Sequence, residues 1–523
     1  MCDGVAGVVS WQLPAEPGYR NLAINIIRSE CSTRSALMRF RVIAACVIAA
    51  SFSALETAMA ETLPAFYGIA EEDFANPQIL LAESSDDLFG DDGGDDDSSS
   101  ADDLFGSDTD SSDPNVIGGI RFSGFWQNSL AYTYPDDSHY SKFLNIFKLR
   151  LNGRISEHIT WQASGRLNYD PVFEFENFYP DEVEDDQKLD GWIDETFLDI
   201  SVGNFEFRLG RQNIVWGEMV GLFFADVVSA LDLRQFVLPD FEIIRVPQWS
   251  VRAEYFNGGF HGDVVFIPVV TTNNIGEVGA EYFPFPITNI GGIPVRFADE
   301  NEPDGDFGED FGFGVRGSYY KDGWDVSAFY YTAPDREAAF ERTITLGGPV
   351  PDILFRAQHE RIHQFGATIA KDLGDFVIKS EAIFTKDRLV SVVDVTDLDG
   401  LTETDELRYV IGANWSLDKH TFNAQFFQTW FTEPETSMFV DEIETGITLR
   451  ASTTSWHKDV EPEVIFIRSL NRNEWLLQAK VDWRFRQNWR ATLGADIAEG
   501  DETNFFGRYD DTDRVYYELR YSF

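Results

Sequence analysis

The chain has 523 residues, of which 89 are Asp or Glu and 41 are Lys or Arg, so that the formal net charge is −48. A nucleic-acid-binding protein needs a basic face, and this composition argues against that class. Aromatic residues make up 15% of the chain. Because no run of about 18 uncharged, mostly apolar residues offers a spanning helix, a membrane location would require a closed β-barrel.

Residues 38–60, MRFRVIAACVIAASFSALETAMA, contain the three parts of a secretory signal peptide. Arg39 and Arg41 supply the positively charged region, and an apolar stretch of 14 residues follows from Val42 to Leu55. Ala58-Met59-Ala60 has the small-x-small pattern of a cleavage site. We therefore expect an exported protein whose signal peptide is cleaved. A buried helix or a helical anchor is the alternative for this stretch.

Cleavage at this site would start the mature protein at Glu61. Residues 1–37 are then interpreted as a gene-model artefact upstream of a start at Met38. All cysteines precede the cleavage site, namely Cys2, Cys31 and Cys46. The mature protein would contain no thiol, which excludes a cysteine nucleophile, a disulfide framework and a thiolate metal site.

Residues 61–115 form an acidic leader with 17 Asp or Glu and no Lys or Arg, in which DDLFG occurs at Asp86–Gly90 and again at Asp102–Gly106. Such a segment buries too little apolar surface to fold, so the prediction is a disordered periplasmic spacer. Its two Leu-Phe pairs are the basis of an alternative, in which the leader docks a periplasmic partner. Loose Ca²⁺ binding by the Asp clusters is a third reading, although the spacing of an EF-hand loop is absent.

From about residue 116 apolar and polar residues alternate with a period of two. In residues 475–485, for example, Leu477, Val481 and Trp483 alternate with Gln478, Asp482 and Arg484. This period predicts strands with one apolar and one polar face, which a soluble sandwich would also show.

The connections between these strands decide between barrel and sandwich. Short turns are expected at 153–158, 202–204, 257–259, 321–323, 372–374, 417–420 and 486–488, and long loops at 171–191, 213–245, 269–309, 333–357, 387–403 and 433–472. Short turns at one end and long loops at the other are typical of a transmembrane barrel. We predict an all-β fold over 116–523: an antiparallel, up-and-down transmembrane β-barrel of about 16 strands with both ends periplasmic.

Two further features of the sequence agree with this prediction. The last strand ends in Phe523, which resembles the signal that the barrel-assembly machinery of the outer membrane reads. Aromatic residues near strand ends fit the girdles of an outer-membrane barrel, namely Trp161, Tyr169, Trp192, Trp249, Trp324, Trp415, Trp475 and Trp489.

Residues 207–247 read FRLGRQNIVWGEMVGLFFADVVSALDLRQFVLPDFEIIRVP. The Gly-Arg-Gln and Trp-Gly-Glu elements, the following Asp-Leu-Arg and the later Arg-x-Pro resemble a porin-like proteobacterial outer-membrane β-barrel family of unknown function. Its members are often encoded near exporters of the RND type and lipid-handling proteins. The resemblance implies an outer-membrane location and transport, and it names no substrate.

Arg211 in this stretch would face lipid under a strict period of two, at a cost of about 2–4 kcal/mol at depth. We expect a bulge at Gly210 that turns Arg211 into the lumen. The long loop after it contains Trp216, Glu218, Asp232 and Arg234, and we expect it to fold into the pore through pairing of Arg211, Glu218, Asp232 and Arg234. An ordered external loop is the alternative.

Basic residues dominate the polar face of the predicted strands. They are Lys148, Arg150, Arg166, Arg208, Arg252, Arg316, Lys480, Arg484, Arg490 and Arg520, against Glu206, Glu254, Asp482 and Glu518. Rings of Arg and Lys in a pore favour anions. The simpler interpretation is that these charges pair across strands to fill the lumen.

His359-Glu360-Arg361-Ile362-His363 matches the H-E-x-x-H pattern of zinc proteases, in which both His residues lie on a helix. Here the segment leads directly into a predicted strand, so we expect neither a zinc site nor a metalloprotease. The sequence has no G-x-S-x-G motif. A Ser–His site of a surface hydrolase, assembled from residues far apart in the sequence, is the alternative.

These observations predict a Gram-negative outer-membrane channel, not an enzyme, that conducts small anionic or amphipathic solutes without a cofactor. One alternative is a barrel that handles hydrophobic molecules or lipids with periplasmic or exporter partners, and another is an outer-membrane hydrolase. The expected partners are outer-membrane lipid and lipopolysaccharide, the barrel-assembly machinery, and a periplasmic protein bound through residues 61–115. No nucleic-acid partner is expected.

Overall fold

The structure is a computed structural model, which describes residues 116–523 except 118, 136, 218, 220–224, 286–288, 291–292, 299–307, 346–350, 393, 395, 435–437, 439 and 455–458. The predicted artefact, signal peptide and acidic leader lie outside the described residues. Among the described residues, no helix is both long and apolar enough to cross a membrane.

Eighteen antiparallel strands form a closed barrel, in which each strand pairs with the next barrel strand along the chain. The barrel closes where β2 pairs with β25, from Phe125 opposite Ser522 to Thr133 opposite Arg514. A two-residue strand, β1 (Val116–Ile117), pairs with the start of β2. The barrel strands are β2 (Ile120–Thr133), β3 (His139–Ser156), β4 (Ile159–Tyr169), β5 (Leu189–Val202), β6 (Phe205–Gln212), β9 (Gln248–Asn257), β10 (Phe260–Ile267), β13 (Gly312–Lys321), β14 (Trp324–Pro334), β17 (Arg361–Asp372), β18 (Phe376–Ser391), β19 (Leu401–Leu417), β20 (His420–Phe431), β21 (Ile443–Thr453), β22 (Val460–Ser469), β23 (Trp475–Arg486), β24 (Trp489–Glu499) and β25 (Arg514–Ser522).

The two faces of the barrel wall differ as the alternation predicts. Large apolar side chains remain exposed on the outer face, for example Phe147 at 44%, Trp483 at 51% and Leu493 at 56%. Polar side chains such as Lys148 and Glu406 are buried on the inner face. An apolar outer face over a polar interior is suited to lipid. The predicted fold class, a transmembrane up-and-down β-barrel, is confirmed.

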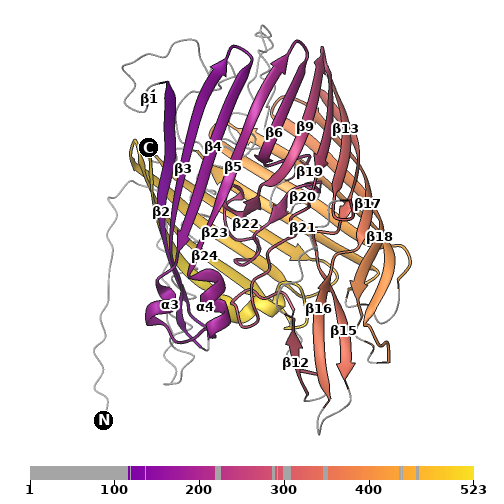
Figure 1. Ribbon diagram of the computed structural model, residues 1–523. Coiled ribbons are helices and arrows are strands. Elements are labelled where there is room, and N and C mark those ends of the chain that lie inside the picture. The colour runs from indigo at the N-terminus through magenta and orange to yellow at the C-terminus, as the bar shows by residue number, and fades with distance from the viewer. Residues whose placement is uncertain are drawn as a thin grey trace, which may run out of the picture.

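The connections differ in length at the two ends of the barrel. The seven short turns predicted from the sequence all join consecutive barrel strands, and β21 ends at Thr453 and β22 begins at Val460 at the same end. The long connections leave from the opposite end, where Figure 1 draws α3, α4, β12, β15 and β16, away from the short turns and the C-terminus. By the rule for such barrels, the end with the short turns is periplasmic.

The predicted number of strands was wrong, because the barrel has 18 strands and not about 16. The missing pair is β21 and β22, which lie in the stretch 433–472 that the sequence predicts as one loop. Pro462 in β22 is a residue that usually marks an edge strand or no strand. The β21–β22 ladder ends at Ser452 opposite Glu463, the residue that follows this proline, so that Pro462 itself lies outside the ladder. The predicted loop 387–403 is also shorter, because β18 extends to Ser391 and β19 begins at Leu401.

Several long connections contain secondary structure. The connection between β4 and β5 contains α3 (Val172–Phe175) and α4 (Asp181–Gln187), and that between β6 and β9 contains β7 (Ala230–Leu231), α5 (Phe241–Ile244) and β8 (Arg245–Val246). Beyond the rim, β11 (Asn289–Ile290), β12 (Ile293–Phe297), β15 (Ala339–Thr345) and β16 (Asp352–Gln358) form a small sheet around buried Phe340 and Phe355. A short 3-10 helix, η2 (Gly507–Thr512), lies between β24 and β25.

The position of β21 can be tested with single spin labels. Leu449 is 45% exposed on the outer face, whereas Ser452 lines the internal cavity described below. In lipid vesicles a label at Leu449→Cys should be relaxed by oxygen, which concentrates in the bilayer, and a label at Ser452→Cys by a water-soluble nickel complex. Equal access of the nickel complex to both labels would show that 443–453 is an external loop.

Candidate functional site

The described part of the connection between β6 and β9, residues 213–217, 219 and 225–247, lies inside the barrel, where Figure 1 draws it in magenta. We call it the inner loop. Its first half is buried: Ile214 is 0%, Trp216 1% and Val228 2% exposed. These side chains form one apolar cluster with wall residues of β10, β14 and β18, namely Val265, Ile267, Phe329, Tyr331, Ala333 and Ile383. One side of the lumen is therefore filled, as expected of a loop that folds into the pore.

Trp216 fixes the position of the apolar half. Its Nε1 donates to Oδ2 of Asp263 over 3.0 Å, and Asp263 also accepts from Nη2 of Arg252 over 2.8 Å. The indole ring lies against Gly314 of β13, where an added Cβ would be only 2.5 Å from Cη2 of Trp216. The missing side chain at Gly314 thus makes room for the indole.

The second half of the inner loop borders a cavity of about 820 Å³. Its walls come from β2 to β5 and from β20 to β25, the side of the barrel away from the apolar cluster. Eleven Lys or Arg and nine Asp or Glu line it, so the cavity is net basic in a chain of formal charge −48. The basic members are Lys142, Arg150, Arg166, Arg234, Arg245, Arg450, Lys480, Arg484, Arg490, Arg514 and Arg520.

Two carboxylates of the inner loop contact this basic wall. Asp240 accepts from Nζ of Lys480 over 3.0 Å, and Glu242 accepts from Arg520 over 2.9 Å and from Lys148 over 3.2 Å. The charge of Lys480 holds the pKa of Asp240 well below its usual range, against the effect of burial. Burial would raise the pKa of Glu242, but the charges of Lys148 and Arg520 lower it to about 2. Both carboxylates are therefore ionised at neutral pH.

Arg234 anchors the middle of the inner loop. Its guanidinium is paired with Asp232 (Nε to Oδ1, 2.9 Å), with Asp190 of β5 (Nη2 to Oδ2, 2.6 Å) and with Asp186 of α4 (Nη1 to Oδ1, 3.4 Å). Burial raises the pKa of Asp186, which Arg234 opposes. At the downstream end, Arg245 pairs with Asp226 over 3.1 Å, and both residues are buried.

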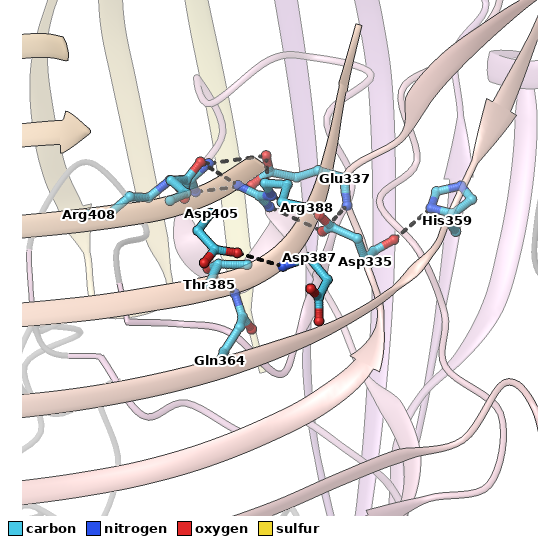
Figure 2. Close-up of polar contacts among 10 residues, drawn as sticks. Asp335, Glu337, His359, Gln364, Thr385, Asp387, Arg388, Asp405 and Arg408 are labelled. Carbon is cyan, nitrogen blue, oxygen red and sulfur yellow. Dashed lines mark hydrogen bonds and ion pairs between the residues drawn. The ribbon is translucent and has the colours of Figure 1, made fainter. Parts of the chain in front are cut away.

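A second charged cluster lies at the extracellular end of β18 and β19. Arg388 binds Asp335 through two bonds of 2.8 and 3.1 Å and Glu406 through one of 2.9 Å, and its side chain is only 6% exposed. Figure 2 shows Arg388 between Asp335 and Arg408, with Glu337 above them. Burial would raise the pKa of Glu337, but Arg388 and Arg408 bring it well below its usual range.

A bulge in β18 positions this cluster. The ladder runs from Thr385 opposite Glu406 to Arg388 opposite Thr404, so β18 contains one residue more than β19. Asp387 takes the strained backbone angle, with φ of 64°. The extra residue turns Arg388 to the inner face, where it meets the loop after β14.

The H-E-x-x-H residues do not form a helix. His359 and Glu360 precede β17, and His363 lies in it. Nδ1 of His359 is 2.7 Å from the carbonyl of Asp335, as Figure 2 shows, and Nδ1 of His363 is 2.9 Å from the hydroxyl of Tyr330. In the described part of the chain, no group of three or more His, Cys, Asp or Glu could hold a metal ion.

Residues 147–523 match the family described as "Protein of unknown function (DUF1302)". The chain belongs to this family. The match covers most of the chain, and it agrees with the predicted resemblance to a β-barrel family of unknown function. No curated protein matches the sequence.

Solved structures with a similar fold include OccAB1 of Acinetobacter baumannii, with a TM-score of 0.48 and 9% identity over 78% of this chain and 98% of that one. OccAB4 of the same organism has a TM-score of 0.47 and 11% identity over 78% and 99% of the two chains. OccK8 (OprE) of Pseudomonas aeruginosa has a TM-score of 0.47 and 10% identity over 78% and 98%.

The expected bulge at Gly210 is absent from both ladders of β6. Gly210 faces Phe197 on one side and Ser250 on the other, without a shift in register. Arg211 is therefore opposite Trp249, which is 50% exposed on the outer face. The outward position is tolerated because Arg211 is one residue from the end of the strand, where charges cost little, and its Nε donates to the carbonyl of Pro247 over 3.0 Å.

The expected four-residue pairing was partly wrong. Asp232 and Arg234 pair with each other, but Arg211 lies outside the barrel, and Glu218 lies outside the described residues. Trp192, expected in an aromatic girdle, is directly opposite Arg166 and faces the lumen, where its ring is 3.9 Å from the Arg166 guanidinium.

The remaining predicted lumen residues do lie on the inner face of the wall. Arg208 pairs with Asp199 over 2.7 Å, and Arg484 with Glu461 over 2.9 Å. Arg252 binds Asp263, and Arg316 is directly opposite Asp263 in the ladder. Much of the predicted cross-strand pairing is thus present. Of the ten basic residues predicted to face the lumen, six line the cavity, namely Arg150, Arg166, Lys480, Arg484, Arg490 and Arg520, whereas Lys148, Arg208, Arg252 and Arg316 do not.

Sequence reasoning missed Asp240, Glu242 and Arg388. The first two lie between the Asp-Leu-Arg and Arg-x-Pro elements, whose charged residues anchor the loop. Two acids between two anchored motifs are a signal that could have identified them. Arg388 falls in a predicted loop, and only the pairing partner of β18 reveals the bulge that turns it inward.

Gly314→Ala should disturb the docking of Trp216. The new Cβ would meet Cη2 of Trp216 at 2.5 Å and Cδ2 of Tyr331 at 3.0 Å. Overpacking of this kind costs about 1–3 kcal/mol, so we expect a lower unfolding temperature and a red-shifted tryptophan emission. Gly317→Ala is the matched control, because its nearest neighbour would be at 3.8 Å. Identical behaviour of the two variants would contradict the docking of the indole on Gly314.

Arg388→Met should destabilise the extracellular end of β18. It would leave Asp335 and Glu406, which are 8% and 1% exposed, without their shared partner. Loss of one member of a buried ion pair costs about 3–5 kcal/mol, measurable as a shift in urea unfolding. Glu406→Gln added to Arg388→Met should recover part of the loss. A variant as stable as Arg468→Met, a control on the outer face, would show that the cluster contributes no stability.

Proposed function

We propose that this protein is a channel of the Gram-negative outer membrane that conducts small anionic solutes. The observation that carries the proposal is the cavity of about 820 Å³ with eleven basic and nine acidic residues on its walls. The inner loop narrows the lumen to this side of the barrel, since the apolar cluster around Trp216 fills the other. A solute that passes must then move along the basic wall.

Electrostatics supports an anionic solute. In ladder register, Arg484 is opposite Arg490, and Arg490 is opposite Arg520, so three guanidinium groups lie in one row across β23, β24 and β25. Like charges directly opposite each other on one face repel, and the row is favourable only with anions beside it. Basic rows facing acidic loop residues also create a transverse field, a common basis of selectivity in pores.

The alternatives have less support. Handling of fully apolar molecules fits poorly with twenty charged residues around the cavity, because burying charges against an apolar solute is costly. A mixed wall with Leu144, Ile146, Val237 and Leu238 suits amphipathic anions better. No observation in the described residues favours a hydrolase, and His359 and His363 are engaged by Asp335 and Tyr330.

The partners predicted from the sequence belong to the same proposal. The apolar outer face supports contact with outer-membrane lipid and lipopolysaccharide. The C-terminal strand supports insertion by the barrel-assembly machinery. Docking of a periplasmic protein on residues 61–115 stays a prediction from the acidic composition and the repeated DDLFG motif.

The test is the reversal potential of the purified protein in planar bilayers under a KCl gradient. Wild type should prefer chloride. Arg150→Gln, on the cavity wall, should lower the anion-to-cation ratio about twofold, because one charge about 8 Å away in water contributes about 0.5 kcal/mol. Arg468→Gln, on the outer face, should not change the ratio. Absence of current, or a preference for potassium, would overturn the proposal.

A further inference from the structure

Residues 239–243 of the inner loop, Pro-Asp-Phe-Glu-Ile, are fixed at both flanks and held to the wall by charge in between. We call them the acidic clip. Upstream, Phe236 is buried in a cluster with Leu476 and Tyr509. Downstream, Ile244 is 1% exposed, and Arg245 is paired with Asp226.

The clip itself contacts the wall through Lys and Arg. Lys480 and Arg490 approach Asp240 to 3.0 and 3.7 Å. Arg520 and Lys148 approach Glu242 to 2.9 and 3.2 Å, and Nη1 of Arg166 donates to the carbonyl of Ile243 over 2.7 Å. All five clip residues also line the cavity, so there is open space beside them.

The basic side chains of the wall opposite the clip are neutralised by carboxylates of the chain itself. Arg490 and Arg520 are directly opposite in the β24–β25 ladder, and both charges need a counter-anion. Asp240 and Glu242 supply it. The other acids near the row have partners of their own: Glu463 pairs with Arg450 at 2.5 Å and Glu461 with Arg484 at 2.9 Å. Asp482 accepts a hydrogen bond from Thr492 and approaches Arg490 only to 4.0 Å, farther than Asp240 at 3.7 Å.

Departure of the clip alone would leave buried or half-buried cations without counter-charge, which is strongly unfavourable. Departure is feasible when another anion takes the same place. Because the clip presents two carboxylates from residues two positions apart, the matching replacement is a molecule with two carboxylates. Its body would lie beside the apolar wall formed by Leu144, Ile146 and Leu238.

We propose that the wall around Arg490 and Arg520 is a binding site for dicarboxylate solutes, and that Asp240 and Glu242 occupy it until such a solute displaces them. The proposal rests on the channel function argued above and names the substrate class of that site. The clip is then both the constriction of the resting channel and a competitor of the solute.

The experiment compares wild type with Asp240→Asn/Glu242→Gln, which keeps the shape of the clip and removes its charge. Full-length proteins in detergent are titrated calorimetrically with succinate, propionate and inorganic phosphate, and their conductance is measured in planar bilayers. Without its competitor the site should bind succinate at least about tenfold more tightly, since a tethered competitor acts at about millimolar effective concentration. The open conductance should rise as well.

Asp181→Asn/Glu182→Gln is the matched control, with the same changes at two exposed positions of α4. It should bind succinate as wild type does. Arg490→Gln added to Asp240→Asn/Glu242→Gln, the clip-neutral variant, should weaken succinate binding. This measurement tests the site even if the loop of the clip-neutral variant rearranges and leaves its conductance unchanged. Heat-modifiable migration on gels establishes that each variant forms the barrel.

The outcomes separate the two proposals. Equal succinate affinity of wild type and the clip-neutral variant would overturn the displacement of the clip. Equal affinities for succinate and propionate, or tighter binding of phosphate, would overturn the dicarboxylate class. Tighter succinate binding in the clip-neutral variant together with no current in any protein would support the site and reject the channel function.

Discussion

Inside a bilayer the backbone must satisfy its own hydrogen bonds, and the pairing of β2 with β25 is the contact through which this chain does so. With the cylinder closed, alternation of side chains assigns apolar residues to lipid and polar residues to the interior. Twenty charged side chains thereby line one cavity of the interior. The inner loop enters that space because its apolar half and its charged half each find a matching wall there.

The two halves of the inner loop are held by different forces, and their consequences differ. The half around Trp216 is buried against β10, β13 and β14, an arrangement that resists salt and pH. The half around Asp240 and Glu242 is bound by ion pairs beside open space, where competing anions can act. Because the half around Trp216 is fixed, movement of the inner loop would be limited to the half around Asp240 and Glu242. That half lies on the side of the lumen through which solutes would pass.

The sequence predicted the barrel, its turns and the loop inside it, because a period of two and the spacing of turn residues are local properties. It missed β21 and β22, since Pro462 argues against a strand, whereas the structure places this proline next to the end of the β21–β22 ladder and outside it. It placed a bulge at Gly210, where the ladder is regular, and none at Asp387, where one exists. Bulges depend on the partner strand, and ion pairs such as Arg234 with Asp190 depend on distant loops, so neither can be derived from local pattern alone.

The contact between Gly314 and Trp216 has a consequence for the order of folding. Phe313 and Val315, the neighbours of Gly314, have side chains on the opposite face of β13, and a slip of one residue would turn one of them into the indole. The inner loop can dock only after β10, β13 and β14 have paired in their final register. We therefore expect the loop to be inserted after these strands have paired, because its docking requires a correctly registered wall.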